Sequence, residues 1–449
     1  MLGECKRHVL SNGLRVLGVE NSGLHSFVCS VYARVGSRFD PSELTGLSHF
    51  LEHMMLQGSE NFPTSAAIMR SIEELGGLVD AGTYPEYINV VFGVHRKHWP
   101  RALEIAGDVL LHPLFSKDEI EQEKRIIAQE ISQHRDRAGQ NISVSELSHA
   151  LLFSGEVSEA GTCGSRAILE RFDRPTVEGH YRKFFVPRNM VVCFAGAFEF
   201  SEVLCRVERS FGAMEAGSQV PQGPVPPPAG ANSRARALYR TTEALPLVEV
   251  MLSHRAYPLG DERFDGVRAV SHVLGGGLSS RLFTRVREEL GLVYDVESHL
   301  QGYSDTGTLD VFLTVSVENL VRAVEAALEV VRQTRAEGFS AEELERYKEA
   351  ARCGMDMLCD DASHLADWFG RQELLLGADH VLTPRQYVRR QEALSVDVLN
   401  AVGHETLSEE HATFFVIGPF GEAERDALQR LLPAEEIKVA QEPPARAGT

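Results

Sequence analysis

Apolar residues in the first 140 positions recur at intervals of three and four, the spacing of helices that bury one face. Four segments show this pattern: 44–56, 64–75, 99–111 and 116–134. Each segment also carries polar residues on the opposite face. The pattern therefore predicts amphipathic helices that pack on a common core.

Other segments have the pattern of strands. Residues 26–35 alternate between apolar and polar side chains, and residues 88–94 and 189–195 are short apolar runs. Residues 9–19 place Ser-Asn-Gly at 11–13 between alternating apolar residues, which predicts a hairpin. Helices and strands together predict an α+β fold in which a mostly antiparallel sheet packs with helices.

A segment rich in Pro, Gly and Ala divides the chain at 214–236 and predicts an interdomain linker. The segments on either side show a weak repeat: FSKDEIE begins at Phe115, and FSAEELE begins at Phe339, 224 positions later. Both copies read as a helix start with a serine N-cap and acidic residues in the first turn. We therefore expect two homologous α+β domains, at 1–213 and 237–449.

Composition limits the class of protein. The 449 residues are 43% hydrophobic, enough for two cores, and no run of about 18 to 20 apolar residues predicts a membrane span. The net charge of -19 argues against nucleic acid or anionic membrane as a partner and fits a basic or neutral partner, although it also simply favours solubility. Seven cysteines without a CxxC pair predict reduced, mostly buried thiols. With no signal-like start, we expect a cytoplasmic protein.

The clearest chemistry lies in the first predicted helix, which reads His49-Phe-Leu-Glu52-His53. Residues four apart share one helix face, so both imidazoles can converge on a single metal ion. Glu52 stands near enough to take a proton from metal-activated water without being a ligand. The alternative is an ordinary helix whose histidines are solvated on its polar face.

A second helix supplies two acidic residues on one face. Glu123 and Glu130 stand seven residues apart, close to two turns, within the predicted helix 116–134. Glu130 could complete a zinc site with three protein ligands, and Glu123 could orient a ligand or the base. The alternative is that both carboxylates simply face solvent, as most helix glutamates do.

The HxxEH motif followed 77 residues later by Glu130 resembles the pitrilysin family of inverted zincins. The similarity extends to HYRKFFVPRNMV at 180–191 and, in the second half, to GGGLSSRLF at 275–283 and REELGLVY at 287–294, so it covers nearly the whole chain. The resemblance implies zinc ligands at His49, His53 and Glu130, a general base at Glu52, an assisting carboxylate at Glu123, and substrate-binding residues at Arg287 and Tyr294.

The resemblance also implies one zinc ion per chain. The positions 224 residues after His49, Glu52, His53 and Glu130 hold Val273, Gly276, Gly277 and Gly354, none of which can supply an equivalent ligand. Family substrates are expected to add as an extended strand beside Asp80 and Ala81. The family usually has asparagine at the place of Asp80, so this acidic residue is a departure that would favour a cationic substrate residue or alter the rate.

From this sequence we expect a zinc metalloendopeptidase that cleaves unstructured peptides or leader peptides. Relatives of this length imply a homodimer, or a heterodimer with a related subunit. A non-catalytic or partner-dependent subunit of a heterodimeric peptidase is the alternative. A zinc-dependent hydrolase of a substrate other than a peptide is a third reading, to which the second-half signature lends no support.

Overall fold

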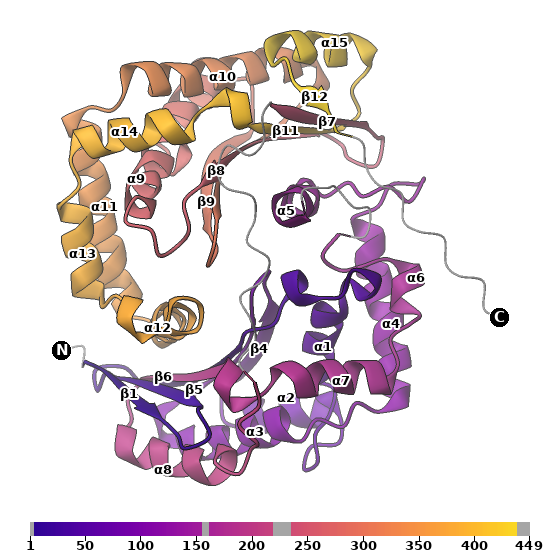
Figure 1. Ribbon diagram of the computed structural model, residues 1–449, viewed down its shortest axis with the longest axis vertical. Helices are drawn as coiled ribbons and strands as arrows, with labels where there is room; N and C mark the ends of the chain where they lie inside the picture. The colour runs from indigo at the N-terminus through magenta and orange to yellow at the C-terminus, as the bar shows by residue number, and fades with distance from the viewer. Residues whose placement is uncertain (1–3, 155–160, 219–234, 438–449) are drawn as a thin grey trace. The chain divides into compact units, whose positions relative to one another are not determined.

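The computed structural model describes residues 4–154, 161–218 and 235–437 (Figure 1). The chain divides into two compact units, each made of three segments. Unit 1 comprises Met1–Ile131, Ala160–Gly223 and Gly354–Gln386, and unit 2 comprises Ser132–Glu159, Pro224–Cys353 and Tyr387–Thr449.

Unit 1 is built on a six-stranded sheet with the order β1-β2-β6-β3-β5-β4. Its strands are β1 (Cys5–Val9), β2 (Arg15–Glu20), β3 (Ser26–Ala33), β4 (Leu78–Thr83), β5 (Ile88–His95) and β6 (Met190–Gly196). Neighbouring strands are antiparallel except β2 and β6. The predicted strands are confirmed, and the hairpin is present with its first strand ending at Val9, earlier in the chain than expected.

Helices cover both faces of this sheet: α2, α3 and α8 lie on one face, and α12 lies on the other (Figure 1). The helices mainly in unit 1 are α1 (Leu47–Met55), α2 (Ser65–Glu73), α3 (Trp99–Leu111), α4 (Lys117–Gln133), α6 (Arg166–Leu169), α7 (Arg174–Phe184), α8 (Phe200–Phe211) and α12 (Ala362–Leu376). Short 3-10 turns are η1 (Ser37–Phe39), η2 (Ser42–Leu44), η3 (Arg96–His98), η4 (Pro187–Asn189) and η7 (Ala378–His380). All four predicted helices are present.

Unit 2 repeats this architecture with the strand order β12-β7-β11-β8-β10-β9. Its strands are β7 (Arg236–Thr241), β8 (Val248–Ala256), β9 (Asp295–Gly302), β10 (Gly307–Val315), β11 (Thr413–Gly418) and β12 (Glu435–Glu436). Apart from β1 and β12, the two sheets follow the same chain order, since β2-β6-β3-β5-β4 corresponds to β7-β11-β8-β10-β9. The prediction of two similar α+β halves is confirmed.

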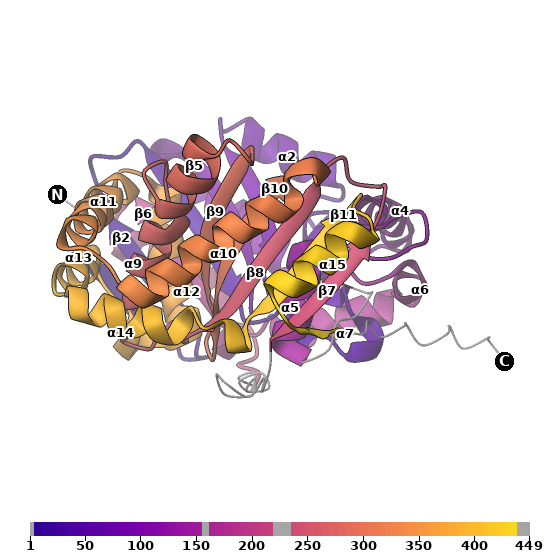
Figure 2. The ribbon, with the colours of Figure 1, turned by 90° about the horizontal axis from the view of Figure 1, so that it is seen from above.

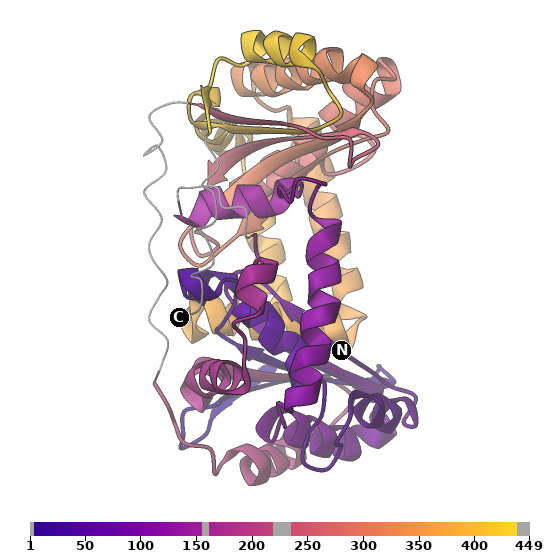
Figure 3. The same ribbon diagram turned by 90° about the vertical axis from the view of Figure 1, so that its right-hand side faces the viewer.

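In unit 2, helices α9, α10, α14 and α15 lie on one face of the sheet (Figure 2), and α5 contacts β8 and β11 on the other (Figure 3). The helices mainly in unit 2 are α5 (Val144–Ser154), α9 (Phe264–Gly275), α10 (Leu320–Glu337), α11 (Ala341–Cys359), α13 (Pro384–Glu392), α14 (Val396–Thr406) and α15 (Glu422–Leu431). A π-helical segment, η5 (Phe283–Glu289), and the 3-10 turns η6 (Val317–Asn319) and η8 (Glu409–His411) complete it.

The repeated helix starts are present in both units. Ser116 precedes α4, and its Oγ accepts a hydrogen bond from the Glu119 amide at 3.3 Å. Ser340 precedes α11, and its Oγ accepts from the Glu343 amide at 3.2 Å. Both serines thus satisfy an amide that the helix itself leaves free, as the repeat predicts.

The compact units differ from the predicted domains 1–213 and 237–449, because each unit contains a helix from the other half of the sequence. Helix α12 packs on β3 and β6 of unit 1, where Gly370 lies so close to Tyr32 that an added Cβ would be 2.3 Å from its ring. Helix α5 packs in unit 2, where Leu147 and Leu151 join a cluster with Phe415 and Ile417. The exchange buries an apolar sheet face in each unit. Most of the predicted linker 214–236 lies outside the described residues.

None of the seven cysteines, which all lie among the described residues, is paired in a disulfide. The expectation that most are buried is wrong, since only Cys29 and Cys193 are buried, while Cys205 and Cys353 are exposed. In the described part of the chain, no helix combines the length and the apolar composition needed to cross a membrane.

One buried histidine makes the stability of unit 2 depend on pH. His254 in β8 is 1% exposed; its Nδ1 lies 3.3 Å from the Ser408 carbonyl oxygen, and its Nε2 has no partner. Burial lowers the pKa of His254 to about 4. The folded-state pKa is thus depressed below that of the unfolded chain.

Neutral His254 should make its full contribution to the free energy of unfolding above the unfolded-state pKa of about 6.5. This contribution should be lost as the pH falls towards 4. Between pH 7.5 and pH 5 we expect the free energy of unfolding of the wild-type unit to fall by about 2 kcal/mol more than that of His254→Gln. Urea unfolding at the two pH values measures the difference. Equal acid sensitivity of the two proteins would contradict the assignment.

Candidate metal centre

Helix α1 is held in unit 1 by one apolar face. Leu47, Phe50, Leu51, Met54 and Met55 are each at most 2% exposed and belong to the core of unit 1. Because these residues occupy the inward face, His49, Glu52 and His53 are left together on the remaining, partly exposed face. The helix thus presents three polar side chains from a rigid, buried support.

The two imidazoles converge. His49 Nε2 and His53 Nε2 lie 3.2 Å apart, and the ring planes are inclined by 79°. A tetrahedral zinc ion with Zn–N bonds of about 2.0–2.1 Å holds two nitrogens about 3.3–3.4 Å apart. The spacing of these nitrogens therefore fits a shared zinc ion.

The protonation of His49 and the hydrogen bond of His53 bear on metal binding. Burial lowers the pKa of His49 to about 4, so that this imidazole is neutral at neutral pH. Burial also disfavours charge on His53, yet the hydrogen bond with Glu123 and the carboxylates of Glu52 and Glu130 raise the pKa of His53. Since His53 Nδ1 donates to Glu123 Oε2 at 3.0 Å, the lone pair of Nε2 can face the site.

Helix α4 places both predicted glutamates beside α1. Glu130 Oε2 lies 3.8 Å from His49 Nε2 and 3.8 Å from His53 Nε2. Glu123 is 2% exposed and bonds His53. The face predicted from the seven-residue spacing thus points at the histidines. Two imidazole nitrogens and one carboxylate oxygen are the donor set of many zinc hydrolases, so the residues present fit zinc.

Glu52 completes the group and has its own support. Its carboxylate and the two imidazoles offer atoms that lie within 4.8 Å of one another. Thr83 Oγ1 donates a hydrogen bond to Glu52 Oε2 at 3.0 Å. Burial raises the pKa of Glu52; His53 and Thr83 oppose this shift, and Asp80 and Glu130 add to it. A carboxylate with a raised pKa is suited to accept a proton near neutral pH.

Strand β4 forms the edge of the sheet beside this group. Among the described residues it pairs with β5 alone, so its other side is open to an added strand. Asp80 and Ala81 both lie on it, and the Ala81 amide donates to Asp80 Oδ1 at 3.0 Å. Thr83, on the same strand, was not selected from the sequence. Its position two residues after Ala81, on the same face, is the signal that could have found it.

Comparison with known proteins shows the family to which the chain belongs. Residues 15–163 match the sequence model described as "Insulinase (Peptidase family M16)", and residues 171–351 match that of the "Peptidase M16 inactive domain". The chain belongs to the pitrilysin family, peptidase family M16. The first match contains α1, α4 and β4, and thus the whole candidate centre.

Individual relatives and solved structures cover nearly the whole chain. YmxG of Bacillus subtilis, named as an uncharacterized zinc protease, is 28% identical over 416 residues, which are 93% of this chain and 98% of the relative. A protease from Helicobacter pylori has the same fold, with a TM-score of 0.82 at 17% identity, over 92% of this chain and 99% of that one. A Pseudomonas fluorescens structure described as a peptidase M16 inactive domain gives a TM-score of 0.81 at 19% identity, over 93% and 98%.

The two substrate-binding residues predicted in the second half, Arg287 and Tyr294, lie close together in unit 2. The Arg287 guanidinium lies 4.7 Å from the centre of the Phe283 ring and 5.4 Å from that of Tyr294. Arg287 stands in η5, and the extra residue of a π-helical turn changes the direction of the side chains that follow it. Tyr294 is 80% exposed, so its hydroxyl and the guanidinium form an accessible pair of donors.

One glycine of the segment 275–283 has a clear structural reason. A Cβ on Gly275, at the end of α9, would lie 2.5 Å from the Ser298 backbone nitrogen of β9. Glycine therefore permits the helix to approach the strand closely. Leu278, in the loop that follows α9, has a side chain that is 77% exposed to solvent.

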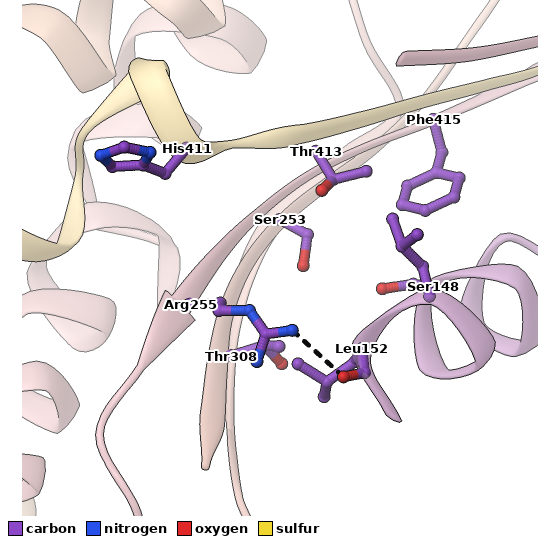
Figure 4. A pocket seen from close by; sticks show the side chains of 9 residues that line it. Ser148, Leu152, Ser253, Arg255, Thr308, His411, Thr413 and Phe415 are labelled. Atoms are coloured by element: carbon purple, nitrogen blue, oxygen red, sulfur yellow. Dashed lines mark hydrogen bonds between the residues drawn. The ribbon is translucent and has the colours of Figure 1, made fainter. Parts of the chain in front are cut away.

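A pocket in unit 2 lies between α5 and the sheet (Figure 4). Its lining residues are Ser148, Leu151, Leu152, Ser253, Arg255, Thr308, His411, Thr413 and Phe415. Ser253 and Thr308 donate hydrogen bonds to the buried Asp310 carboxylate, and Arg255 donates to the Leu152 carbonyl at 3.1 Å. These polar side chains therefore make hydrogen bonds within unit 2. None of the predicted site residues lines the pocket.

Proposed function

We propose that this protein is a zinc metalloendopeptidase with one zinc ion per chain. The observation that carries the proposal is the convergence of His49 Nε2, His53 Nε2 and Glu130 Oε2, at mutual distances of 3.2 and 3.8 Å, beside the Glu52 carboxylate. Names of relatives as zinc proteases support it. His49, His53 and Glu130 would hold the ion.

We assign the following roles in catalysis to residues of this chain. Zinc, when bound, would lower the pKa of a water molecule and polarise a peptide carbonyl. Glu52 takes a proton from the attacking water and passes it to the departing amine, while the Thr83 hydroxyl keeps its carboxylate in place. Glu123 fixes the orientation of the His53 ring. No covalent enzyme intermediate is needed.

The proposed substrates are unstructured peptides or leader peptides. An extended segment can hydrogen bond to the open edge of β4 at Asp80 and Ala81, because main-chain pairing does not depend on side chains. The acidic Asp80 would favour a cationic residue near that point. Arg287 and Tyr294 would donate hydrogen bonds to substrate carbonyl oxygens.

The direct test is cleavage of a mixture of short unstructured peptides, followed by mass spectrometry with and without a zinc chelator. We expect cleavage that the chelator abolishes and that added zinc restores. Cleavage that persists in chelator would refute a zinc mechanism. The mixture should include paired peptides with and without a basic residue, to measure the preference attributed to Asp80.

A second function is a partner-dependent or non-catalytic subunit of a heterodimeric peptidase. It is favoured by one structural neighbour, the Pseudomonas fluorescens protein described as an inactive domain. The complete set of Glu52, His49, His53 and Glu130 opposes a non-catalytic role. A zinc-loaded protein that cleaves no peptide alone but cleaves peptides with a related subunit would support the partner-dependent form. The mass of the protein in solution would distinguish a homodimer from a heterodimer.

Replacing Arg287 by alanine should weaken peptide binding without removing zinc. The loss of a charged hydrogen-bond donor is worth about 1.5–3 kcal/mol, which corresponds to a rise in KM of about ten- to a hundredfold. The matched control is Arg285→Ala, which removes a guanidinium of the same π-helical segment that is paired with Glu289. Equal KM values for wild type and Arg287→Ala would reject the substrate role.

A further inference from the structure

The start of helix α1 is tied to a buried network of three side chains. The Asp40 carboxylate accepts hydrogen bonds from the Gly46 amide at 2.9 Å, the Ser48 amide at 3.0 Å and the Ser48 hydroxyl at 2.6 Å. His180 Nε2, from α7, lies 3.0 Å from Ser48 Oγ. Ser48 is fully buried, and the side chains of Asp40 and His180 are 1% and 4% exposed.

The directions of these bonds follow from the chemistry of the groups. The Ser48 hydroxyl has one hydrogen, and the 2.6 Å contact uses it on the Asp40 carboxylate. Ser48 Oγ must then accept from His180, whose Nε2 therefore carries the hydrogen. The network runs from α7 through Ser48 to Asp40 and fixes the first turn of α1 in both position and rotation.

The next residue along the chain is His49, and its support differs from that of His53. The Nδ1 of His53 is bonded to Glu123, whereas the Nδ1 of His49 is buried and has no hydrogen-bond partner. Metal-binding histidines usually use their second nitrogen in a hydrogen bond that fixes the ring. His49 lacks this bond, so its orientation depends on the backbone that carries it.

We propose that Asp40, Ser48 and His180 are positioning residues that hold His49 in place for the zinc ion by anchoring the first turn of α1. This inference rests on the proposed zinc function and assigns to the network the role that Glu123 has for His53. None of the three residues is among the proposed zinc ligands. They act through the helix that connects Ser48 to His49.

The chain offers a matched control in the same unit. Ser59 is fully buried, and its hydroxyl donates to Asp108 Oδ2 at 2.6 Å, while Asp108 also accepts from the Asn61 amide at 3.1 Å. Removal of Ser59 or Ser48 therefore deletes the same kind of hydrogen bond, with the same length and burial. Of the two serines, Ser48 alone lies within α1, the helix that carries the histidines.

The experiment measures the zinc affinity of the full chain by competition with a chelating dye, and thermal unfolding of the metal-free proteins. We expect Ser48→Ala and Asp40→Asn to bind zinc about ten- to a hundredfold more weakly than wild type. Ser59→Ala and Asp108→Asn should lose a similar amount of thermal stability and keep the wild-type zinc affinity. Equal affinities in Ser48→Ala and Ser59→Ala would overturn the proposal and reduce the network to a structural cap.

A pair of substitutions at His180 protects the test from misfolding. His180→Gln keeps an N–H donor near Ser48 and should retain most of the zinc affinity, whereas His180→Leu removes the donor and should lose it. Equal affinity of these two variants would count against the proposal. A wild-type protein that binds no zinc would instead refute the proposed function, so the two failures are distinguishable.

Discussion

The variant Glu52→Gln is expected to retain zinc and to lose peptide hydrolysis by about 10²- to 10⁴-fold. Glutamine has nearly the same shape and can still meet the Thr83 hydroxyl, which bonds Glu52 at 3.0 Å in the wild type. It cannot accept a proton, however, so the step that requires a base fails. The measurements are kcat for a cleaved peptide and the zinc content of the purified variant.

A control keeps this result specific. Glu43→Gln changes an exposed glutamate in η2 of the same unit and should leave both quantities unchanged. Loss of zinc from Glu52→Gln would show that Glu52 is a ligand and that the roles assigned within the motif are wrong. Wild-type turnover in this variant would exclude Glu52 as the base.

Glu130→Gln should have the second large effect, on metal affinity. Glu130 Oε2 lies 3.8 Å from both histidine nitrogens, close enough to complete their coordination of one ion. Loss of an indirect partner of a metal ligand costs about 10- to 100-fold in affinity, so loss of a direct ligand should cost more than about 100-fold. Chelator competition measures the affinity, and hydrolysis should fall in parallel at limiting zinc.

The matched control for this substitution lies on the same helix. Glu121 in α4 is 49% exposed and pairs with Lys124, so Glu121→Gln alters an equivalent side chain away from the histidines. We expect it to bind zinc as the wild type does. A fully metallated, active Glu130→Gln protein would mean that another residue is the third ligand.

Much of the centre follows from local helix geometry. A four-residue interval between His49 and His53, and a seven-residue interval between Glu123 and Glu130, place each pair on one face of any regular helix, whatever surrounds it. For the same reason the repeat at Phe115 and Phe339 correctly predicts two capped helices, one in each unit. Period and spacing are properties of the chain, so they can be read without tertiary structure.

Contacts between distant segments could not be predicted in this way. Thr83 reaches Glu52 across 31 positions, and His180 reaches Ser48 across 132, because sheet and helices pack in a particular arrangement. The departure from the predicted domains has the same origin. Which helix covers an apolar sheet face depends on the path of the chain in three dimensions. The exchange of α5 and α12 between the units therefore cannot be read from the local spacing of apolar residues.

For this protein, the sequence alone determined the two similar α+β halves, the HxxEH motif and the family, because each is encoded in residue types at fixed short intervals or in repeated segments. Tertiary structure alone decided that α4 meets α1 with Glu130 3.8 Å from both imidazoles, that Thr83 supports Glu52, and that Asp40 and His180 anchor the helix through Ser48. The physical reason is that these contacts arise from the packing of separate elements, which depends on the whole core.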